Sequence, residues 1–393
     1  MSVSLNTSIS RASAIDRTLV VAAASLLLLG LVMIASASID VADARNGNPF
    51  HYAVRHGLFI VMGLMAAVAV YQVPTSAWQN KSWLCLSIAL FLLVLVLLPG
   101  VGKTVNGSTR WIGLGVINLQ PSELAKLLLV AYLSAYLVRR NAEVRSSWWG
   151  FLKPMFILSF AAALLLAEPD FGATVVIACA FLGMIFLSGA RLGQFILLIF
   201  ASIAVGTLLI LSQPYRLQRL IGYTDPWADQ FGSGYQLTQS LIAFGRGDWW
   251  GVGLGNSVQK QFYLPEAHTD FVFAIIGEEF GLLGSCLVVA LFSVLVYRAV
   301  RIGMNAERLQ RFYDAYFAYG IAILFAVQAF INMGVNMGML PTKGLTLPLV
   351  SYGGSSLIVS CMALAVLLRI HRQTASSSEE VSQNQMGGAA YAR

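Results

Sequence analysis

The chain has 393 residues, of which 58% are hydrophobic and only 11% are charged. Because a soluble domain carries about 25% charged residues, this composition excludes an ordinary soluble protein and predicts an integral membrane protein. The formal net charge of +7 does not indicate nucleic-acid binding, because the cations lie between apolar runs rather than in a basic domain.

Apolar runs of the length that crosses a bilayer, about 17–25 residues, occur about ten times along the chain. They lack the apolar–polar alternation of barrel strands, so we predict an all-α membrane protein with about ten transmembrane helices. The first run is longer than the core of a signal peptide and is predicted to be a retained span. In chain order the predicted spans are Thr18–Ser38, Val54–Val73, Ser82–Leu98, Ser122–Val138, Pro154–Ala167, Phe171–Ser188, Leu192–Leu211, Phe271–Val296, Phe312–Gly334 and Leu349–Arg369.

Arginine and lysine concentrate in one set of short loops, which predicts that these loops and both termini are cytoplasmic. The predicted organisation is a cytoplasmic tail (1–17), a membrane domain (18–372) and a C-terminal tail (373–393) that is rich in Ser, Gln, Gly and Ala and expected to be disordered. Residues 213–270, between the seventh and eighth spans, form a large loop on the outer side. Nucleotide sugars are cytoplasmic, so a reaction at this loop needs a donor that is already activated and exported.

The segment Gly100–Ser122 is a glycine-rich outer loop that carries Lys103 and Arg110. Cations and backbone N–H groups are the usual ligands of phosphate, so Arg110 is a candidate for diphosphate binding. The alternative is a packed loop with solvated charges. Gly102-Lys103-Thr104 resembles a phosphate loop but lacks the first glycine of that pattern, so nucleotide binding is rejected.

The fourth span opens with Gln120-Pro121-Ser122-Glu123, which suits a helix start, and Glu123 suits the positive end of the helix dipole. Lys126 lies one turn inside this apolar helix, on the same face as Glu123. A charge within a span usually faces a cavity or a partner. Lys126 is therefore a candidate cation for an anionic head group, with a structural ion pair to Glu123 as the alternative.

Two acids, Glu168 and Asp170, share the three-residue turn between the fifth and sixth spans. Paired carboxylates can shape a polar cavity or hold a divalent cation. The alternative is a solvated turn in which Asp170 caps the sixth helix.

Asp270 ends the long loop, and the residues after it are apolar. Its carboxylate should therefore lie where water meets lipid, where partial desolvation raises basicity and where a lipid-linked head group is within reach. The alternative is a helix cap. His268 and Glu266 lie close by, whereas Glu278 and Glu279 within the span are expected to be structural, paired with Lys126 or Arg110.

The segment Leu340–Ser356 contains prolines and glycines that interrupt the helical pattern at the outer face. Irregular backbone at this depth survives only where protein or a cavity covers it. Lys343 in this segment is a candidate phosphate ligand, with a snorkelling interface lysine as the alternative.

Several motifs resemble those of the SEDS family (shape, elongation, division and sporulation), whose members polymerise peptidoglycan glycan strands. The resemblance spans nearly all of the membrane region, and LPTKGLTLP resembles the cell-division type. EPDFGA differs at Glu168 from the common QPDxGT form. Ser351 of the last motif is a candidate for substrate binding, as are Glu123, Asp170 and His268. The motifs are STRWIGLG, LQPSELAK, EPDFG, LPEAHTDFVFAIIGEEFG and LPTKGLTLPLVSYGGSS.

The resemblance implies a SEDS fold and an inverting glycosyl transfer in the cell inner membrane at the division septum. Lipid II, an undecaprenyl-diphosphate-linked disaccharide pentapeptide, is the acceptor and the growing lipid-linked strand is the donor. Asp270 is implied as the essential acid, acting as a general base. We expect Arg110 and Lys126 to stabilise the leaving diphosphate, with Lys343 or a divalent cation (Mg²⁺ or Mn²⁺) as a further contributor.

The resemblance also implies partners: the class B penicillin-binding protein FtsI, under control of FtsQ, FtsL and FtsB. Two other functions stay open on the sequence. One is a lipid II flippase, which the charged residues within spans would suit, although transporter sites usually lie at the midplane. The other is a non-catalytic scaffold for division proteins.

Overall fold

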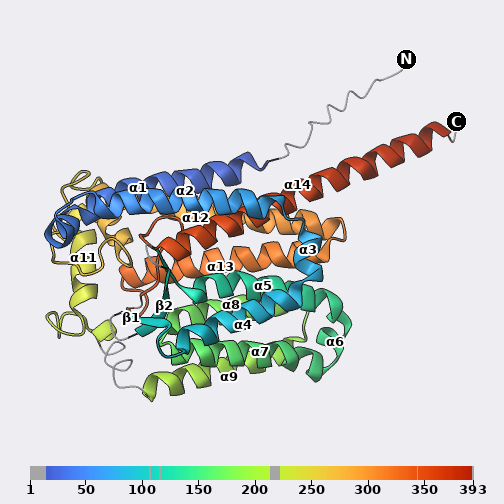
Figure 1. Cartoon of the computed structure of the whole chain (residues 1–393), viewed down its shortest axis with the longest axis horizontal. Coiled ribbons are helices and arrows are strands. Elements are labelled where there is room, and N and C mark those ends of the chain that lie inside the picture. The colour runs from blue at the N-terminus through green and yellow to red at the C-terminus, as the bar shows by residue number, and fades with distance from the viewer. Residues whose placement is uncertain (1–14, 106–107, 115–116, 213–221, 343, 392–393) are drawn as a thin grey trace.

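The computed structural model describes residues 15–105, 108–114, 117–212, 222–342 and 344–391. Helices dominate, and a small sheet lies between α4 and α5 (Figure 1). The elements are α1 (Arg17–Asn46), α2 (His51–Gln72), α3 (Thr75–Asn80), α4 (Ser82–Leu97), β1 (Gly102–Val105), β2 (Ser108–Leu114), β3 (Ile117–Leu119), α5 (Pro121–Arg139), α6 (Asn141–Ser146), α7 (Trp148–Ala167), α8 (Phe171–Leu187), α9 (Leu192–Leu211), α11 (Tyr235–Gly247), α12 (Val272–Arg308), α13 (Phe312–Asn336) and α14 (Gly354–Tyr391).

Every apolar run that the sequence predicts to span the membrane overlaps one of these helices and extends beyond its ends by at most five residues; the tenth predicted run begins at Leu349, five residues before α14. Among the described residues, seven helices are long and apolar enough to cross a bilayer: α1, α2, α5, α7, α12, α13 and α14. The other predicted spans coincide with shorter apolar helices, which are α4, α8 and residues 192–208 of α9. The prediction of a predominantly helical, multi-pass membrane protein is confirmed.

The three-stranded antiparallel sheet corrects the expectation of a purely α fold. The strands pair in the order β1-β2-β3, with Gly102 opposite Ile112 and Ile112 opposite Leu119. The sequence contains the signal for this hairpin, because Asn106-Gly107 separates two runs rich in β-branched residues. The structure thus replaces the expected glycine-rich loop by a sheet over these strands.

The chain also contains helical segments that the sequence analysis did not predict. Three are short helices, α3, α6 and α11, of which α11 lies within the long loop. In addition, α14 continues to Tyr391, through the tail for which disorder was expected. Ala, Glu and Gln are frequent in that tail, and these residues have high helix propensity.

The helices lie roughly side by side, and their connections gather at the two ends of the bundle. One end, here called the loop end, carries β1–β3, α11 and the residues that precede α12 (Figure 1). The opposite end carries α3 and α6, and the described chain begins and ends on that side (Figure 1). The first nine residues of the predicted long loop, 213–221, lie outside the described residues.

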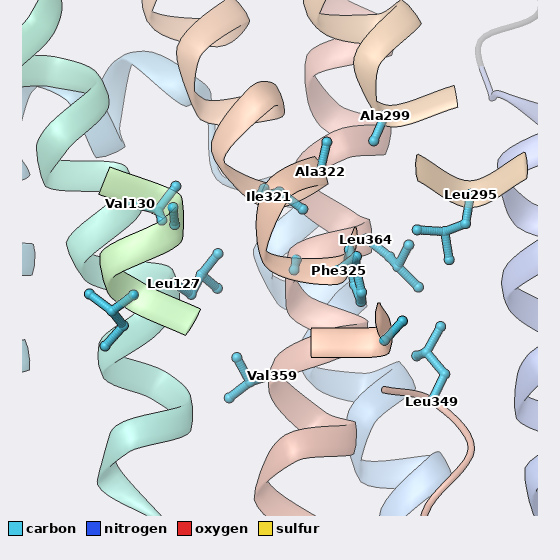
Figure 2. Packing of buried hydrophobic residues seen from close by; sticks show 14 of the residues in the cluster. Leu127, Val130, Leu295, Ala299, Ile321, Ala322, Phe325, Leu349, Val359 and Leu364 are labelled. Carbon is cyan, nitrogen blue, oxygen red and sulfur yellow. The ribbon is translucent and has the colours of Figure 1, made fainter. Parts of the chain in front are cut away.

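The centre of the bundle consists of α5, α13 and α14. The most apolar part of α5 is 83% buried, whereas that of α2 is only 22% buried. The outer helices expose their apolar faces, as lipid-facing helices do. Aliphatic and aromatic side chains of α5, α12, α13 and α14 interdigitate in the core, as Figure 2 shows for Leu127, Leu295 and Phe325. This packing places the start of α5 and the end of α13 inside the protein at the loop end.

A kink in α12 at Gly281 is stabilised by the long loop. Gly281 has φ 65° and ψ −158°, a conformation that only glycine adopts readily. The backbone groups released by the kink bond to the loop: Val252 N donates to the Glu278 carbonyl (3.0 Å) and Leu282 N donates to the Asp248 carbonyl (2.8 Å). Loop and helix are therefore one structural unit at this point.

Replacing Gly281 by alanine is expected to destabilise the protein. The backbone conformation costs a non-glycine residue about 1–3 kcal/mol. The added Cβ would also lie 2.5 Å from the Gly251 nitrogen. Thermal unfolding of the detergent-solubilised protein measures the loss; Gly206→Ala, whose Cβ meets no atom within 4 Å, is the control. An unchanged melting temperature for Gly281→Ala would contradict this assignment.

Candidate functional site

Asp270 lies at the loop end, one residue before the N-cap of α12, and its side chain is half-buried. The predicted alternative, that Asp270 caps the helix, is wrong, because the N-cap residue is Phe271. The capping acceptor comes from α13: Asn336 Oδ1 accepts from Ala274 N (3.0 Å), and Asn336 Nδ2 donates to the Asp270 carbonyl (2.9 Å). Capping α12 is thus the work of Asn336 rather than of the Asp270 carboxylate.

A second amide of α13 joins Asp270 to the irregular segment before α14. Asn332 Nδ2 donates to the carbonyls of Asp270 (2.9 Å) and Leu345 (2.5 Å). The carboxylate faces this segment closely, because a Cβ built on Gly344 would lie 2.8 Å from Asp270 Oδ2. The backbone on both sides of this contact is therefore held by one side chain. The candidate Lys343 lies outside the described residues.

Lys126 occupies a buried polar site one turn inside α5. Its Nζ lies 2.8 Å from Glu123 Oε1 and 2.7 Å from Gln328 Oε1, and both Lys126 and Glu123 are buried. The ion pair with Glu123, which is the alternative for Lys126, is therefore present, and a role in binding a head group stays a prediction. Gln328 Nε2 in turn donates to the Thr346 carbonyl (3.1 Å), so Lys126 is connected through α13 to the segment beside Asp270.

Asp170 is buried and fully engaged at the start of α8. Its Oδ1 accepts from Ala173 N (3.1 Å), which confirms the predicted helix cap. Its Oδ2 accepts from Ser122 Oγ (2.9 Å) and Gln120 Nε2 (3.2 Å), so it also anchors the start of α5. This combination gives Asp170 a structural role as the joint between α5 and α8.

Arg110 and Glu168 are neighbours at the loop end that are incompletely paired. Arg110 on β2 donates from Nη2 to Ser108 Oγ (2.9 Å), while its buried Nε has no hydrogen-bond partner among the described residues. Glu168 is 0% exposed, and neither carboxyl oxygen has a hydrogen-bond partner there. Burial, assisted by the charge of Asp170 and opposed by Arg110, raises the pKa of Glu168 to about 8.

His268 belongs to a cluster of rings beside Asp270. Its ring centroid lies 4.8 Å from that of Tyr52 and 5.8 Å from that of Tyr352, and its carbonyl accepts from Tyr352 N (3.0 Å). Burial lowers the pKa of His268; Glu266 raises it and Arg45 lowers it, so the ring is neutral at pH 7.

Ser351 has an internal bond, since its hydroxyl accepts from Leu347 N (2.8 Å). The hydroxyl thereby stabilises a turn of the segment before α14. A direct contact between Ser351 and substrate stays a prediction.

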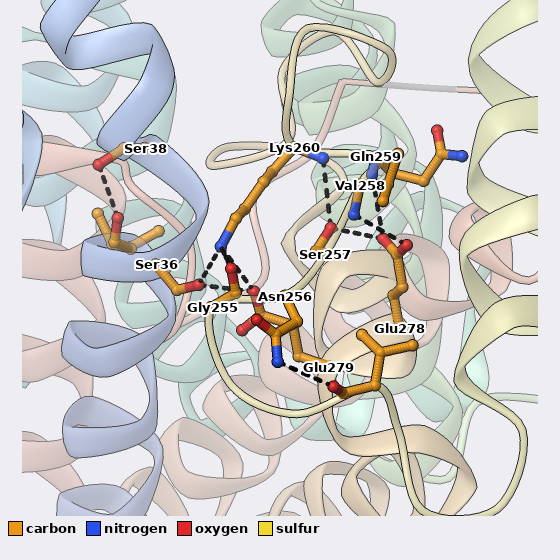
Figure 3. A network of polar contacts seen from close by, with 12 residues as sticks. Ser36, Ser38, Gly255, Asn256, Ser257, Val258, Gln259, Lys260, Glu278 and Glu279 are labelled. Carbon is orange, nitrogen blue, oxygen red and sulfur yellow. Dashed lines mark hydrogen bonds and ion pairs between the residues drawn. The ribbon is translucent and has the colours of Figure 1, made fainter.

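Glu278 and Glu279 are structural, as expected, but the predicted partners Lys126 and Arg110 are wrong. Glu278 pairs with Arg246 of α11 (3.0 Å) and accepts from Ser257, and Glu279 pairs with Lys260 (3.0 Å) and accepts from Ser36 of α1 (2.7 Å). Figure 3 shows Lys260 of the long loop reaching between Ser36 and Glu279. The long loop supplies these cations, and no local pattern in the sequence indicates that it folds back onto α12.

The functional residues that the sequence analysis missed are Gln328, Asn332 and Asn336. They follow one another at intervals of four in the apolar helix α13, so they share one face. Three amides on one face of a membrane helix are a signal of a buried polar path. This signal was available in the sequence and would have identified them.

The site thus combines one half-buried carboxylate held by its backbone with two cations, Lys126 and Arg110, at the same end of the bundle (Figure 1). A carboxylate in this position can accept a proton, and the cations can stabilise an anionic leaving group. The described residues contain no group of three or more His, Cys, Asp or Glu that could hold a metal ion.

Comparison with known proteins establishes the family. The model of the FtsW/RodA/SpoVE family, described as cell cycle protein, matches residues 17–376, so the chain belongs to this family. Proteins described as probable peptidoglycan glycosyltransferase FtsW are similar over most of their length. The one from Hahella chejuensis is 57% identical over 365 residues (93% of this chain, 92% of the relative), and the one from Marinobacter nauticus is 56% identical over 377 residues (95% and 94%).

Two solved structures share the fold. A chain of a structure described as structural coordination of polymerization and crosslinking by a peptidoglycan synthase complex has a TM-score of 0.77 at 27% identity, over 92% of this chain and 99% of that chain. The rod shape determining protein RodA of Thermus thermophilus has a TM-score of 0.68 at 28% identity, over 92% and 97%. The predicted SEDS fold is confirmed.

We predict that Asn332→Ala lowers activity without unfolding the protein. The change removes the donor of the Leu345 carbonyl and one of the two amide donors of the Asp270 carbonyl, which keeps its bond from Asn336. A buried carbonyl without a partner costs about 1–3 kcal/mol, and the backbone beside the Asp270 carboxylate is held by fewer bonds. Glycan synthesis and thermal stability should both be measured. Ser293→Ala, at an exposed hydroxyl that bonds only its own helix, is the control. Full activity of Asn332→Ala would show that this amide does not position the site.

Proposed function

We propose that this protein is a peptidoglycan glycosyltransferase that polymerises lipid II, with Asp270 as the general base. The observation that carries the proposal is the half-buried Asp270 carboxylate, whose backbone is held by Asn332 and Asn336 beside a segment linked to Lys126. Membership of the FtsW/RodA/SpoVE family supports it, as do the relatives described as probable peptidoglycan glycosyltransferases.

The distribution of cations supports an outward-facing loop end. Arg139, Arg145, Arg298 and Arg311 lie at or near the helix ends opposite the loop end, as cytoplasmic cations do under the positive-inside rule. We therefore place both termini in the cytoplasm and Asp270 on the outer face of the inner membrane, at the division septum. Lipid II that has already been exported would reach Asp270 there with its tail still in the bilayer.

In the proposed reaction the 4-hydroxyl of the acceptor's GlcNAc attacks the anomeric carbon of the donor's MurNAc. A new C–O bond forms, the bond to the lipid diphosphate breaks with its electron pair leaving on the phosphate oxygen, and the configuration inverts. Asp270 accepts the hydroxyl proton, a contribution of about 10²–10⁴-fold. Arg110 and Lys126, and by the same chemistry Lys343, stabilise the departing diphosphate, which leaves as a stable anion without a second acid.

The proposed partner is a class B penicillin-binding protein, FtsI, regulated by FtsQ, FtsL and FtsB. One structural relative comes from a peptidoglycan synthase complex described as coordinating polymerization and crosslinking. A polymerase of this kind makes strands that a transpeptidase must then crosslink, so a crosslinking partner fits the chemistry.

Asp270→Asn is expected to reduce glycan synthesis by about 10²–10⁴-fold, because the amide cannot accept the hydroxyl proton. The variant should fold normally, since the bonds from α13 go to the backbone of Asp270. Purified protein in detergent is assayed with lipid II. Glu266→Gln, at an exposed acid four residues away, is the matched control and should retain activity.

Wild-type activity in detergent would make transport unnecessary to explain the function, because no two compartments remain. Normal polymerisation by Asp270→Asn would refute the role of the base. Absence of polymer from the wild type together with its partner would favour a flippase or a scaffold.

Arg110→Gln is expected to raise KM for lipid II by about tenfold or more, the effect of losing about 1.5–3 kcal/mol from a hydrogen bond to a charged group. Initial rates against lipid II concentration measure it. Arg308→Gln, at an exposed arginine of the opposite end, should leave KM unchanged. A normal KM for Arg110→Gln would remove Arg110 from the diphosphate site.

A further inference from the structure

Glu168 is a buried carboxyl group that the proposed reaction does not use. It ends α7 in the turn before α8, it is 0% exposed, and neither oxygen has a hydrogen-bond partner among the described residues. Burying an ionised carboxylate without a partner is strongly unfavourable, and such groups are usually neutralised by a proton. The molecule therefore carries a protonated acid at its loop end.

The nearest charged groups divide into one that is satisfied and one that is not. Asp170 in the same turn accepts hydrogen bonds from Ala173, Ser122 and Gln120. Its carboxylate is therefore already satisfied without Glu168. Arg110 has a buried Nε without an acceptor, and no ion pair joins it to Glu168 within the described chain. The buried carboxyl group of Glu168 and the half-buried Arg110 are thus close enough to affect each other's charge, but among the described residues no hydrogen bond or ion pair joins them.

The described helices packed against α7 and α8 add no other net charge at this end. The segment before α14 contacts Gly172 of α8 through Leu345, and its Lys343 lies outside the described residues. α4 and α9 contain no charged residue, and the charged residues of α6 and α13 lie at the opposite end. α5 contributes Glu123 and Lys126, which neutralise each other. Among the described residues, Asp170 and Arg110 are therefore the charges that act on Glu168, and burial and Asp170 both favour the neutral acid.

We propose that Glu168 is a positioning residue that acts through Arg110. When Glu168 is a neutral acid, the Arg110 guanidinium is available to the substrate diphosphate; when Glu168 is ionised, it attracts the guanidinium away from the diphosphate. This inference rests on the proposed diphosphate role of Arg110. Diphosphate binding and ionisation of Glu168 compete for the same cation, so each disfavours the other.

The competition predicts how lipid II binding depends on pH. The pKa of Glu168 is about 8, so the acid is neutral at pH 7 and ionised at pH 9. A ligand that requires the neutral form then binds about tenfold more weakly at pH 9 than at pH 7, because its apparent Kd grows with the ionised fraction. The diphosphate of lipid II is esterified at both ends, so its own charge is constant over this range.

The test measures lipid II binding to the full chain in detergent at pH 7, 8 and 9, in an Asp270→Asn background that prevents turnover. The parent is expected to lose about tenfold in affinity between pH 7 and pH 9. When Glu168→Gln is added, the Kd should be nearly independent of pH. Glu143→Gln, at a solvent-exposed carboxylate of the opposite end, is the matched control and should keep the tenfold change. The same alkaline loss in Glu168→Gln as in the parent would overturn the proposal.

A second variant keeps the test decisive if Glu168→Gln does not fold. Arg110→Gln with Glu168 intact must also lose the pH dependence, because the effect acts through Arg110; a persistent tenfold change would overturn the inference. The affinity of Arg110→Gln at pH 7 separately tests the diphosphate role. An affinity at pH 7 equal to the parent's would refute that role whatever the pH dependence, while weakened binding at pH 7 with a persistent alkaline loss would refute only the role of Glu168.

Discussion

The structure depends on how irregular backbone is satisfied at the edge of a membrane. Residues 344–353 and the turn at Asp270 lie outside the helices, and peptide groups without a partner are expensive where water is excluded. Side-chain amides of α13 meet much of this need, since Gln328, Asn332 and Asn336 bond the carbonyls of Thr346, Leu345 and Asp270. The helix therefore acts as a rigid template on which both flanks of the site are built.

The groups that hold the backbone at Asp270 belong to α13. The amides bond the Asp270 carbonyl and the first turn of α12, so α13 positions the backbone that carries the carboxylate. Preorganisation of this kind is favourable for catalysis, because the reacting group does not have to be ordered at the moment of reaction.

A second polar cluster keeps the long loop in place without entering the site. Glu278 and Glu279 lie next to the Gly281 kink. Arg246 and two loop N–H groups bind the Glu278 carboxylate, and Lys260 binds Oε1 of Glu279 (Figure 3), while Oε2 of Glu279 has no hydrogen-bond partner among the described residues. Removing one partner of such a buried pair leaves an uncompensated charge, so the loop and the kinked helix are coupled. The charges that position the loop are thus distinct from those available to a substrate.

Local patterns in the sequence determined the membrane class, the position of each long helix, the start of α5 at Pro121, the Glu123–Lys126 pair and the location of Asp270 before a span. Apolar length, helix-start chemistry and i, i+3 spacing act over a few residues, so they can be interpreted without the fold. Only the tertiary structure decided which cations satisfy Glu278 and Glu279, that Asn336 rather than Asp270 caps α12, and that Glu168 is buried beside Arg110 without a bond. These outcomes depend on contacts between segments far apart in the chain, where burial and partner geometry, rather than residue type, determine the free energy of each polar group.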